Sequence, residues 1–255
     1  MKIAICQTDL VWKNRAANYK RMSELIERCK NVELYILPEM WSSGFAVDPS
    51  GAAEHVQDKD SVTSCDSFLW MKETAIRKNA AIAGSLAVEE DGKFYNRLYF
   101  VKPDGSYQYY NKHHLFTYGE EHLRYTPGEE RVIVEYREMR ILLQVCYDLR
   151  FPTFSRNHKD YDMAIYVASW PQPRQGAWDT LIRARAIENQ CYIAAVNRIG
   201  EDPNCQYTGG SALIDPYGEA IAAFAPGQRG VAIATACMEN LNEFREKFPV
   251  LDDAD

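Results

Sequence analysis

The 255-residue sequence lacks any run of about 20 apolar residues, the length that an α-helix needs to cross a bilayer. Near the start, the apolar run of residues 2–7 is about as long as one strand, and polar residues interrupt it too soon for a signal peptide. No Gly/Ser-rich linker, low-complexity tract or block of like charge marks a domain boundary. These absences predict a soluble, cytoplasmic protein that forms a single domain over residues 1–255.

The sequence also lacks the cysteine spacing of a disulfide framework or a structural zinc site. Its seven cysteines are an odd number, and no CxxC pair occurs. An excess of positive charge is missing too, because the formal net charge is −7. We therefore expect no nucleic-acid partner, no membrane and no metal, although a locally positive pocket for a small anion stays compatible with this charge.

Strand-like and helix-like segments alternate along the chain, which indicates an α/β fold. Residues 2–39 and 140–170 both run from a strand through a helix to a second strand, which suggests two related sheets packed face to face with helices outside. A long polar and aromatic loop is expected over residues 111–128. The predicted helices cover about residues 15–26, with Asn14 as N-cap, 66–78, 152–158, 178–189 and from 239, and the predicted strands cover residues 2–7, 34–37, 81–88, 94–101, 106–110, 132–136, 140–145, 163–167, 192–196, 211–214, 220–224 and 231–235.

Three predicted strands end in residues that can carry chemistry, namely Glu39, Cys146 and Trp170. Ligands of open α/β sheets bind beyond the carboxyl ends of the strands, so these residues are candidates for one site. The loop adds Lys112, and its other candidates are His113, His114, Glu120 and Glu121. Taken singly, each has an ordinary alternative: a buried thiol, a structural ion pair, a helix cap or a surface charge.

Together these residue types form a coherent set for amide cleavage. Cys146 can attack a carbonyl as thiolate, and Glu39 can take its proton as general base. The ammonium of Lys112 can stabilise the oxyanion, with the backbone N–H of Tyr147 as a second donor. A second carboxylate, Glu121, can hold the lysine and the departing amine in place.

Three motifs in this order resemble the nitrilase, or carbon–nitrogen hydrolase, superfamily: Leu-Pro-Glu-Met from residue 37, Asn-Lys-His-His-Leu-Phe from residue 111 and Val-Cys-Tyr-Asp-Leu-Arg-Phe-Pro from residue 145. The resemblance covers essentially the whole chain. It implies a four-layer αββα sandwich, no metal or organic cofactor, and a homodimer formed through a helical face. It also implies Cys146 as nucleophile, Glu39 as general base, Lys112 as oxyanion stabiliser and Glu121, rather than Glu120, as the additional glutamate.

Several further segments are similar to those of bacterial omega-amidases, among them Trp-Ser-Ser-Gly-Phe from residue 41, Ser-Trp-Pro-Gln-Pro-Arg from residue 169 and Arg-Ala-Arg-Ala-Ile-Glu-Asn-Gln from residue 183. This similarity implies hydrolysis of the terminal amide of 2-oxoglutaramate or 2-oxosuccinamate. Such a substrate carries a carboxylate, for which Arg174 is the first candidate partner. We interpret Asp148 and Arg150 as a structural pair that orients the chain after Cys146. The residues expected to line the pocket are Phe45, Phe116, Tyr118, Tyr147 and Trp170.

Alternatives remain open at this point. His113 or His114 could serve as the base of a Cys–His hydrolase. Two adjacent histidines point in different directions and are poor joint metal ligands, which weakens a metal hydrolase. Within the superfamily, a nitrilase or an amidase of deaminated glutathione would use the same cysteine, glutamate and lysine. A catalytically inactive binding scaffold is the alternative of another class.

Overall fold

In the computed structural model, which describes residues 1–56 and 64–253, the first of two large β-sheets carries the chain's amino-terminal strand. Its strand order is β15-β1-β2-β4-β5-β6, and the short strand β3 pairs with β4. β1 and β2 are parallel, whereas β15 runs antiparallel to β1. The strands of this first sheet are β1 (Lys2–Gln7), β2 (Leu34–Ile36), β3 (Glu54–His55), β4 (Ala81–Glu90), β5 (Lys93–Val101), β6 (Tyr107–Asn111) and β15 (Gly230–Thr235).

The second sheet has the order β14-β13-β10-β9-β8-β7, with β8, β9 and β10 parallel. Its strands are β7 (Ile133–Tyr136), β8 (Met139–Val145), β9 (Met163–Ala168), β10 (Tyr192–Asn197), β13 (Ala212–Ile214) and β14 (Ala220–Ala223). A separate hairpin of β11 (Ile199–Glu201) and β12 (Gln206–Thr208) was not predicted from the sequence. Strands of three residues are too short to show an alternating apolar pattern.

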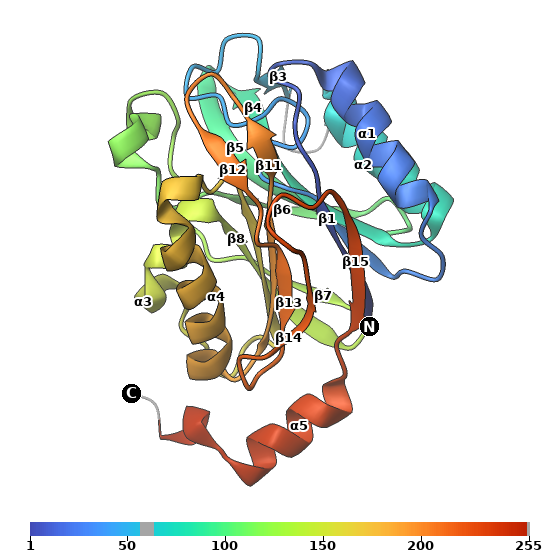
Figure 1. Ribbon diagram of the computed structural model, residues 1–255, viewed down its shortest axis with the longest axis vertical. Coiled ribbons are helices and arrows are strands. Elements are labelled where there is room, and N and C mark those ends of the chain that lie inside the picture. Colours follow the sequence, from blue (N-terminus) through green and yellow to red (C-terminus); the bar gives the residue numbers. More distant parts are fainter. Residues whose placement is uncertain (57–63, 254–255) are drawn as a thin grey trace.

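Helices cover the outer face of each sheet. α1 (Arg15–Glu27) and α2 (Asp66–Lys78) lie outside the first sheet, and α3 (Pro152–Ser155) and α4 (Gln175–Asn189) lie outside the second (Figure 1). The layers therefore follow the order αββα, as predicted. α5 (Met238–Lys247) extends from the lower end of the sandwich (Figure 1). Within the described residues, no helix combines the length and apolar character required of a bilayer span.

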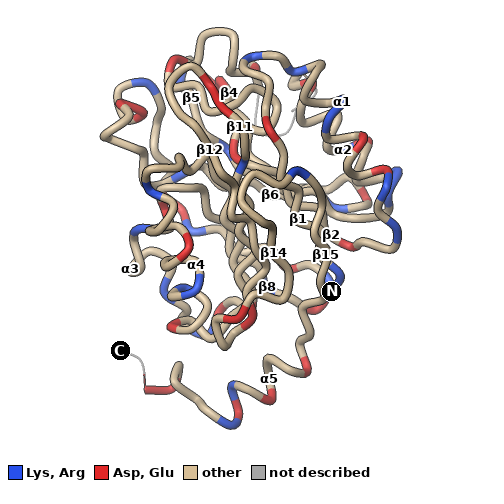
Figure 2. The backbone as a smooth tube through the Cα atoms, viewed as in Figure 1, with Lys and Arg blue, Asp and Glu red and all other residues tan. Residues whose placement is uncertain are grey.

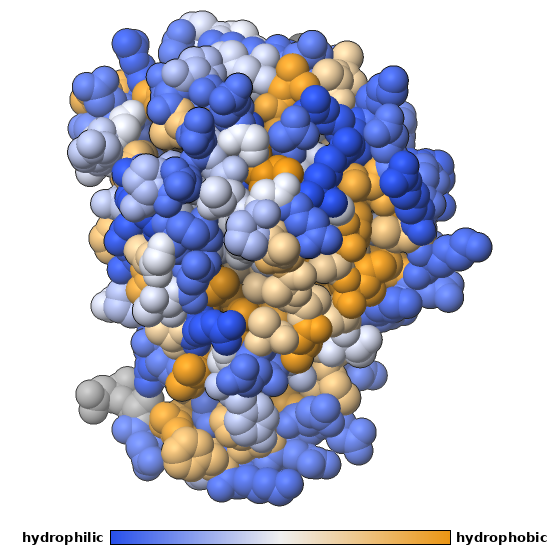
Figure 3. Space-filling model, in the orientation of Figure 1, coloured by the Kyte–Doolittle hydropathy of each residue, from blue (hydrophilic) through white to orange (hydrophobic). Residues whose placement is uncertain are grey.

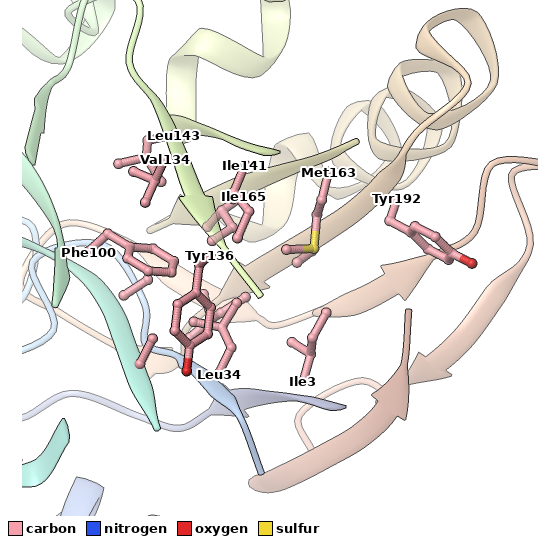
Figure 4. Close-up of a cluster of buried hydrophobic side chains, with 14 of the residues drawn as sticks. Ile3, Leu34, Phe100, Val134, Tyr136, Ile141, Leu143, Met163, Ile165 and Tyr192 are labelled. Atoms are coloured by element: carbon pink, nitrogen blue, oxygen red, sulfur yellow. The ribbon is translucent and has the colours of Figure 1, made fainter. Parts of the chain in front are cut away.

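Buried side chains fill each of the three spaces between these layers. Between the sheets, Ile3 and Leu34 of the first sheet meet Ile141 and Ile165 of the second (Figure 4). Separate apolar clusters lie under α1 and α2 and under α4. Burying one such aliphatic side chain contributes about 1.5–3 kcal/mol, so this packing fixes how the two sheets face each other. Charged residues of both signs are scattered over the outer helices and loops (Figure 2).

Local signals placed most element boundaries correctly. The side chain of Asn14 caps α1 by accepting a hydrogen bond from the N–H of Ala17, and α2 spans the predicted residues 66–78. The helix predicted to reach residue 158 ends at Ser155, because Arg156 is extended and Asn157 is bound to Asn189 of α4. α4 begins at Gln175 rather than at residue 178, directly after a 3-10 turn.

Apolar side chains also gather on the face where the edge strands β14 and β15 lie next to each other (Figure 3). Ile221 of β14 is 39% exposed and Ile233 of β15 is 37% exposed. Each of these strands is at the edge of its own sheet.

Candidate active site

The turn after β8 presents Cys146 at the end of a buried strand. Cys146 has φ +46°, a left-handed conformation that costs a non-glycine residue about 1–3 kcal/mol. It begins a 3-10 helix, η4 (Cys146–Arg150). The buried carboxylate of Asp148 holds this turn, because its Oδ2 accepts hydrogen bonds from the N–H of Val145 at 2.9 Å and from the hydroxyl of Tyr110 at 2.8 Å.

Lys112 follows β6 and is fully buried. Its backbone N–H bonds to the carbonyl of Asn96, which continues the pairing of β5 and β6 by one residue. Its Nζ lies 3.0 Å from Oε1 of Glu39 and 2.9 Å from Oε2 of Glu121. Neither carboxylate has any exposed surface, so a single buried cation pairs with two buried carboxylates inside the protein.

Each of the two carboxylates has backbone or amide donors of its own. Glu39 Oε2 accepts the N–H of Ser169 at 2.7 Å, and its Oε1 accepts the Nδ2–H of Asn96 at 2.7 Å. Glu121 begins the short 3-10 helix η3 (Glu121–Leu123), and its Oε2 accepts the N–H of Phe116 at 2.7 Å. Glu120 is exposed, so the structure places the predicted Glu121 at the cluster and not its neighbour.

The electrostatic environment opposes a resting thiolate. Burial raises the pKa of Cys146 well above its ordinary value, and the nearby charge of Glu39 raises it further, against the lowering effects of Lys112 and the Ser169 N–H. Burial also raises the pKa of Glu121. For Lys112, burial would lower the pKa, but Glu121 and Glu39 outweigh it and hold the pKa well above its usual range. These directions favour a thiol at Cys146 beside a charged Lys112, so attack on a carbonyl by Cys146 would call for a base.

A cavity opens onto Cys146, Glu39 and Lys112. All four residues expected to bind substrate line this cavity: Phe116, Tyr147, Trp170 and Arg174. Phe45 lines it as well. Tyr118 is not part of its lining and is 83% exposed, so the prediction that it lines the pocket is wrong. Tyr118 sits on the outer turn of the loop, where its ring reaches solvent.

The interpretation of Asp148 and Arg150 as a structural pair that orients the turn holds for Asp148, which accepts the N–H of Val145, but it is wrong for Arg150. Asp148 also accepts hydrogen bonds from the N–H and the Nδ1 of His114, both at 2.9 Å. Arg150 turns the other way and lines the cavity, with its guanidinium carbon 4.9 Å from the ring centre of Trp170. η4 is a tight 3-10 turn, and the fixed direction of each of its residues separates the two side chains.

The sequence argument missed several residues of the site. Ser169 and Asn96 bind Glu39 directly, and Cys205 and Tyr207 complete the cavity wall from the β11–β12 hairpin. A polar residue that directly follows strand β9, next to Trp170, was a usable signal for Ser169. No pattern in the sequence distinguished Asn96, which lies in the middle of a strand.

The two histidines lie outside this cavity. His113 Nδ1 bonds to the carbonyl of Gly128 at 2.6 Å and its ring stacks on Phe154, while the ring of His114 stacks on Phe151. Both line a separate hollow on the outer side of the loop. This geometry gives no support to a Cys–His pair. In residues 1–56 and 64–253, no group of three or more His, Cys, Asp and Glu is arranged to hold a metal ion.

Fold, motifs and site geometry define the class: the chain belongs to the carbon–nitrogen hydrolase family, whose sequence profile, described as "Carbon-nitrogen hydrolase", matches residues 2–246. It is thus a hydrolase of carbon–nitrogen bonds. Among its relatives, the chain is 45% identical to "Omega-amidase YafV" of Escherichia coli (strain K12), over all of this chain and 97% of the relative. It is 34% identical to "2-oxoglutaramate amidase" of Bacillus subtilis (strain 168), over 98% of this chain and 96% of the relative.

Solved structures agree with this assignment. The crystal structure of XC1258 from Xanthomonas campestris, described as a CN-hydrolase superfamily protein with an arsenic adduct in the active site, superposes with a TM-score of 0.93 at 40% identity. The match covers all of this chain and 97% of that one. Nit3 of Saccharomyces cerevisiae, a nitrilase superfamily member, has a TM-score of 0.88 at 24% identity over 98% and 94% of the chains, which shows the shared fold.

Proposed function

We propose that this protein is an omega-amidase that hydrolyses the terminal amide of 2-oxoglutaramate or 2-oxosuccinamate to a 2-oxo dicarboxylate and ammonia. The observation that carries the proposal is the opening of one cavity onto Cys146, the buried Glu39–Lys112 pair and two guanidinium groups. The printed names of two relatives, an omega-amidase and a 2-oxoglutaramate amidase, support the substrate class.

In the acylation step, Cys146 Sγ attacks the amide carbon while its proton passes to Glu39. The carbonyl oxygen becomes an oxyanion, which the ammonium of Lys112 and the backbone N–H of Tyr147 stabilise. The tetrahedral intermediate then collapses, the carbon–nitrogen bond breaks, and Glu39 returns the proton to the leaving nitrogen. Ammonia departs and a thioester on Cys146 remains.

In the deacylation step, a water molecule replaces the amine. Glu39 takes one of its protons as the oxygen attacks the thioester carbon, and Lys112 again faces the oxyanion. The carbon–sulfur bond breaks, the thiolate recovers the proton from Glu39, and the product acid is released. The resting thiol of Cys146 is thereby restored, in agreement with its raised pKa.

The charges around the cavity suit a substrate with one carboxylate. Glu39 and Glu121 are offset by three cations, namely Lys112, Arg150 and Arg174, so the site has one positive charge in excess when Cys146 is a thiol. Within the described part of the chain, neither arginine forms an ion pair with a carboxylate. Arg174 instead lies over the ring of Phe116, at 5.1 Å. We propose that these two guanidiniums bind the carboxylate end of the substrate.

The deciding experiment is ammonia release from 2-oxoglutaramate by the wild type and by Cys146→Ala, with glutamine and an aliphatic nitrile as comparison substrates. We expect release from 2-oxoglutaramate to exceed the other two and to be lost in the variant. Preference for the nitrile would favour a nitrilase instead, and deaminated glutathione tested alongside would reveal the related amidase. Undiminished release by Cys146→Ala would overturn the mechanism, and no covalent adduct with any amide or nitrile would favour the binding scaffold.

The remaining expectations stay predictions. We propose that residues 1–255 act as one catalytic domain, although residues 57–63 and 254–255 lie outside the described range. A homodimer formed through a helical face and a cytoplasmic location rest on the resemblance and on composition. Light scattering on the purified protein would report twice the 29.2 kDa chain mass if the dimer forms, and a single chain mass would refute it.

A further inference from the structure

Asn96 of β5 lies between the two carboxylates of the site and has no exposed surface. Its Nδ2 is 2.7 Å from Glu39 Oε1 and 3.3 Å from Glu121 Oε1. Its backbone carbonyl accepts the N–H of Lys112 at 2.9 Å. One strand residue therefore contacts all three members of the buried charge cluster.

The orientation of the Asn96 amide is fixed by these charges. The two hydrogens of Nδ2 are directed at two carboxylate oxygens, and a flipped amide would place its own oxygen against them. The side-chain oxygen Oδ1 of Asn96 is buried without a hydrogen-bond partner. The Asn96 side chain therefore donates from Nδ2 to both carboxylates and leaves its Oδ1 without a partner. This indicates that the two donor contacts decide the orientation of the amide.

This arrangement makes the two oxygens of Glu39 unequal. Oε1 accepts from both Asn96 Nδ2 and Lys112 Nζ, which occupies both of its lone pairs. Oε2 accepts only the Ser169 N–H, so one lone pair is left. Glu39, Ser169 and Cys146 line the same cavity, so the free position on Oε2 is the one available to the thiol proton.

We propose that Asn96 is a positioning residue that commits Oε2 of Glu39 to accept the Cys146 proton. It does so by holding Oε1 in place and by stabilising the charged carboxylate. The inference rests on the proposed function, in which Glu39 is the base for Cys146. The other titratable groups that face Glu39 are Lys112, Glu121, Cys146 and Tyr125, and none of them contributes the second amide donor.

The test follows alkylation of Cys146 by iodoacetamide between pH 5 and 9, with the modified residue located by mass spectrometry. It compares the wild type with Asn96→Ala and Asn96→Asp, and it needs no knowledge of the natural substrate. Without the amide donor, the charged carboxylate that serves as base loses one of its hydrogen bonds, so the acid limb of the rate profile should move to higher pH by about one to two units. We expect the rate at pH 7 to fall about ten- to hundredfold, the effect of a lost hydrogen bond to a charged group.

Asn96→Asp preserves the shape of the side chain but adds a third carboxylate, so its acid limb should move further than that of Asn96→Ala. It also tests the proposal if Asn96→Ala folds poorly. The matched control is Asn157→Ala, which removes a buried asparagine that bonds to the carbonyls of Tyr161 and Asn189. The control should lower the melting temperature and leave the acid limb in place.

The outcomes separate the two proposals. A uniform loss of rate in both Asn96 variants, with the acid limb unmoved, would show a merely structural asparagine and overturn the inference. Unchanged alkylation in both variants would do the same. Alkylation of the wild type at a cysteine other than Cys146 would instead contradict the proposed function.

Discussion

At the scale of single residues, the charge of the site depends on whether Cys146 holds its proton. The buried set of Lys112, Glu39 and Glu121 has one more negative than positive charge, and the thiol adds none while its pKa stays raised. A second negative charge on sulfur would therefore be costly before substrate arrives. In the proposed mechanism this cost is avoided, because the proton passes to Glu39 only as the carbon–sulfur bond forms.

Replacement of Lys112 by methionine tests the role of the buried cation. Two carboxylates would then face each other without compensation, and the oxyanion would lose its charged partner. We expect ammonia release to fall at least about 100-fold and the free energy of unfolding to fall by about 3–5 kcal/mol. The raised pKa of Glu121 should rise further in this variant, so its stability should improve as the pH falls towards 5 and worsen as the pH rises.

Denaturant unfolding at several pH values and an ammonia assay measure these effects. Exposed Lys93→Met is the matched control, and both its activity and its stability should match the wild type. Full activity of Lys112→Met would rule out the proposed role of this lysine.

The two arginines of the cavity wall should determine preference for a carboxylate. Arg150→Gln and Arg174→Gln each remove one charged donor, so we expect kcat/KM for 2-oxoglutaramate to fall about ten- to hundredfold. For an uncharged amide such as pentanamide, kcat/KM should change less than threefold. Arg229→Gln, at a site 42% exposed and paired with Glu24, is the control. Equal losses for charged and uncharged amides would contradict the assignment.

At the scale of secondary-structure elements, Asp148 connects three segments of the site. Its carboxylate accepts from Val145 at the end of β8, from Tyr110 in β6 and from His114 in the loop after Lys112. The strained backbone of Cys146 is therefore tied to the segment that carries the lysine. Loss of this carboxylate should disturb the distance between nucleophile and cation.

Asp148→Ala should consequently lower kcat by about 100-fold and change KM much less. The same substitution should lower the free energy of unfolding by about 3 kcal/mol. Steady-state kinetics and thermal unfolding are the measurements. Asp104→Ala, in an exposed turn where Asp104 accepts bonds from Ser106, should cost less than about 1 kcal/mol and leave kcat unchanged. A variant of Asp148 with normal kcat would show that the turn holds Cys146 without it.

Some elements were predictable from local sequence and others were not. The N-cap Asn14 acts within a few residues, and its prediction was confirmed because capping depends on local chemistry. The end of α3 was misplaced because Asn189, far along the chain, binds the backbone at Asn157. A contact of that kind leaves no periodic pattern in the sequence.

At the scale of the whole molecule, Asp162 joins the second sheet to the C-terminal helix. Its carboxylate, 2% exposed, accepts 2.8 Å hydrogen bonds from Arg140 of β8 and from Arg245 of α5. Burial opposes the charge of Asp162, but the bonds from Arg140 and Arg245 outweigh it and lower its pKa. This junction is the polar anchor of α5, whose Leu241 packs into the core between the sheets.

The pKa of Asp162 is lower in the folded protein than the value of about 3.9 in the unfolded chain. The ionised carboxylate therefore stabilises the fold above about pH 3.9, and this stabilisation is lost as the pH falls through the pKa of Asp162 in the folded protein. We expect Asp162→Asn to cost about 2 kcal/mol at pH 7 and to approach the wild type in stability as the pH falls through the lowered pKa of Asp162. Thermal melts from pH 2.5 to 7 test this, with Asp215→Asn in an exposed turn as control. The same difference in melting temperature between the wild type and Asp162→Asn at every pH would contradict the expectation.

The sequence by itself indicated an α/β fold and most element boundaries, because these depend on local periodicity. The order of three motifs along the chain carried the resemblance to the nitrilase superfamily, and that resemblance implied the αββα sandwich and the grouping of Cys146, Glu39, Lys112 and Glu121. Only the tertiary structure decided that Arg150 faces the cavity, that the histidines turn away from it and that Asn96 bridges the two carboxylates. The direction of a side chain in a tight turn, or of a polar residue inside a buried strand, is set by partners distant in sequence, which the chain order does not reveal.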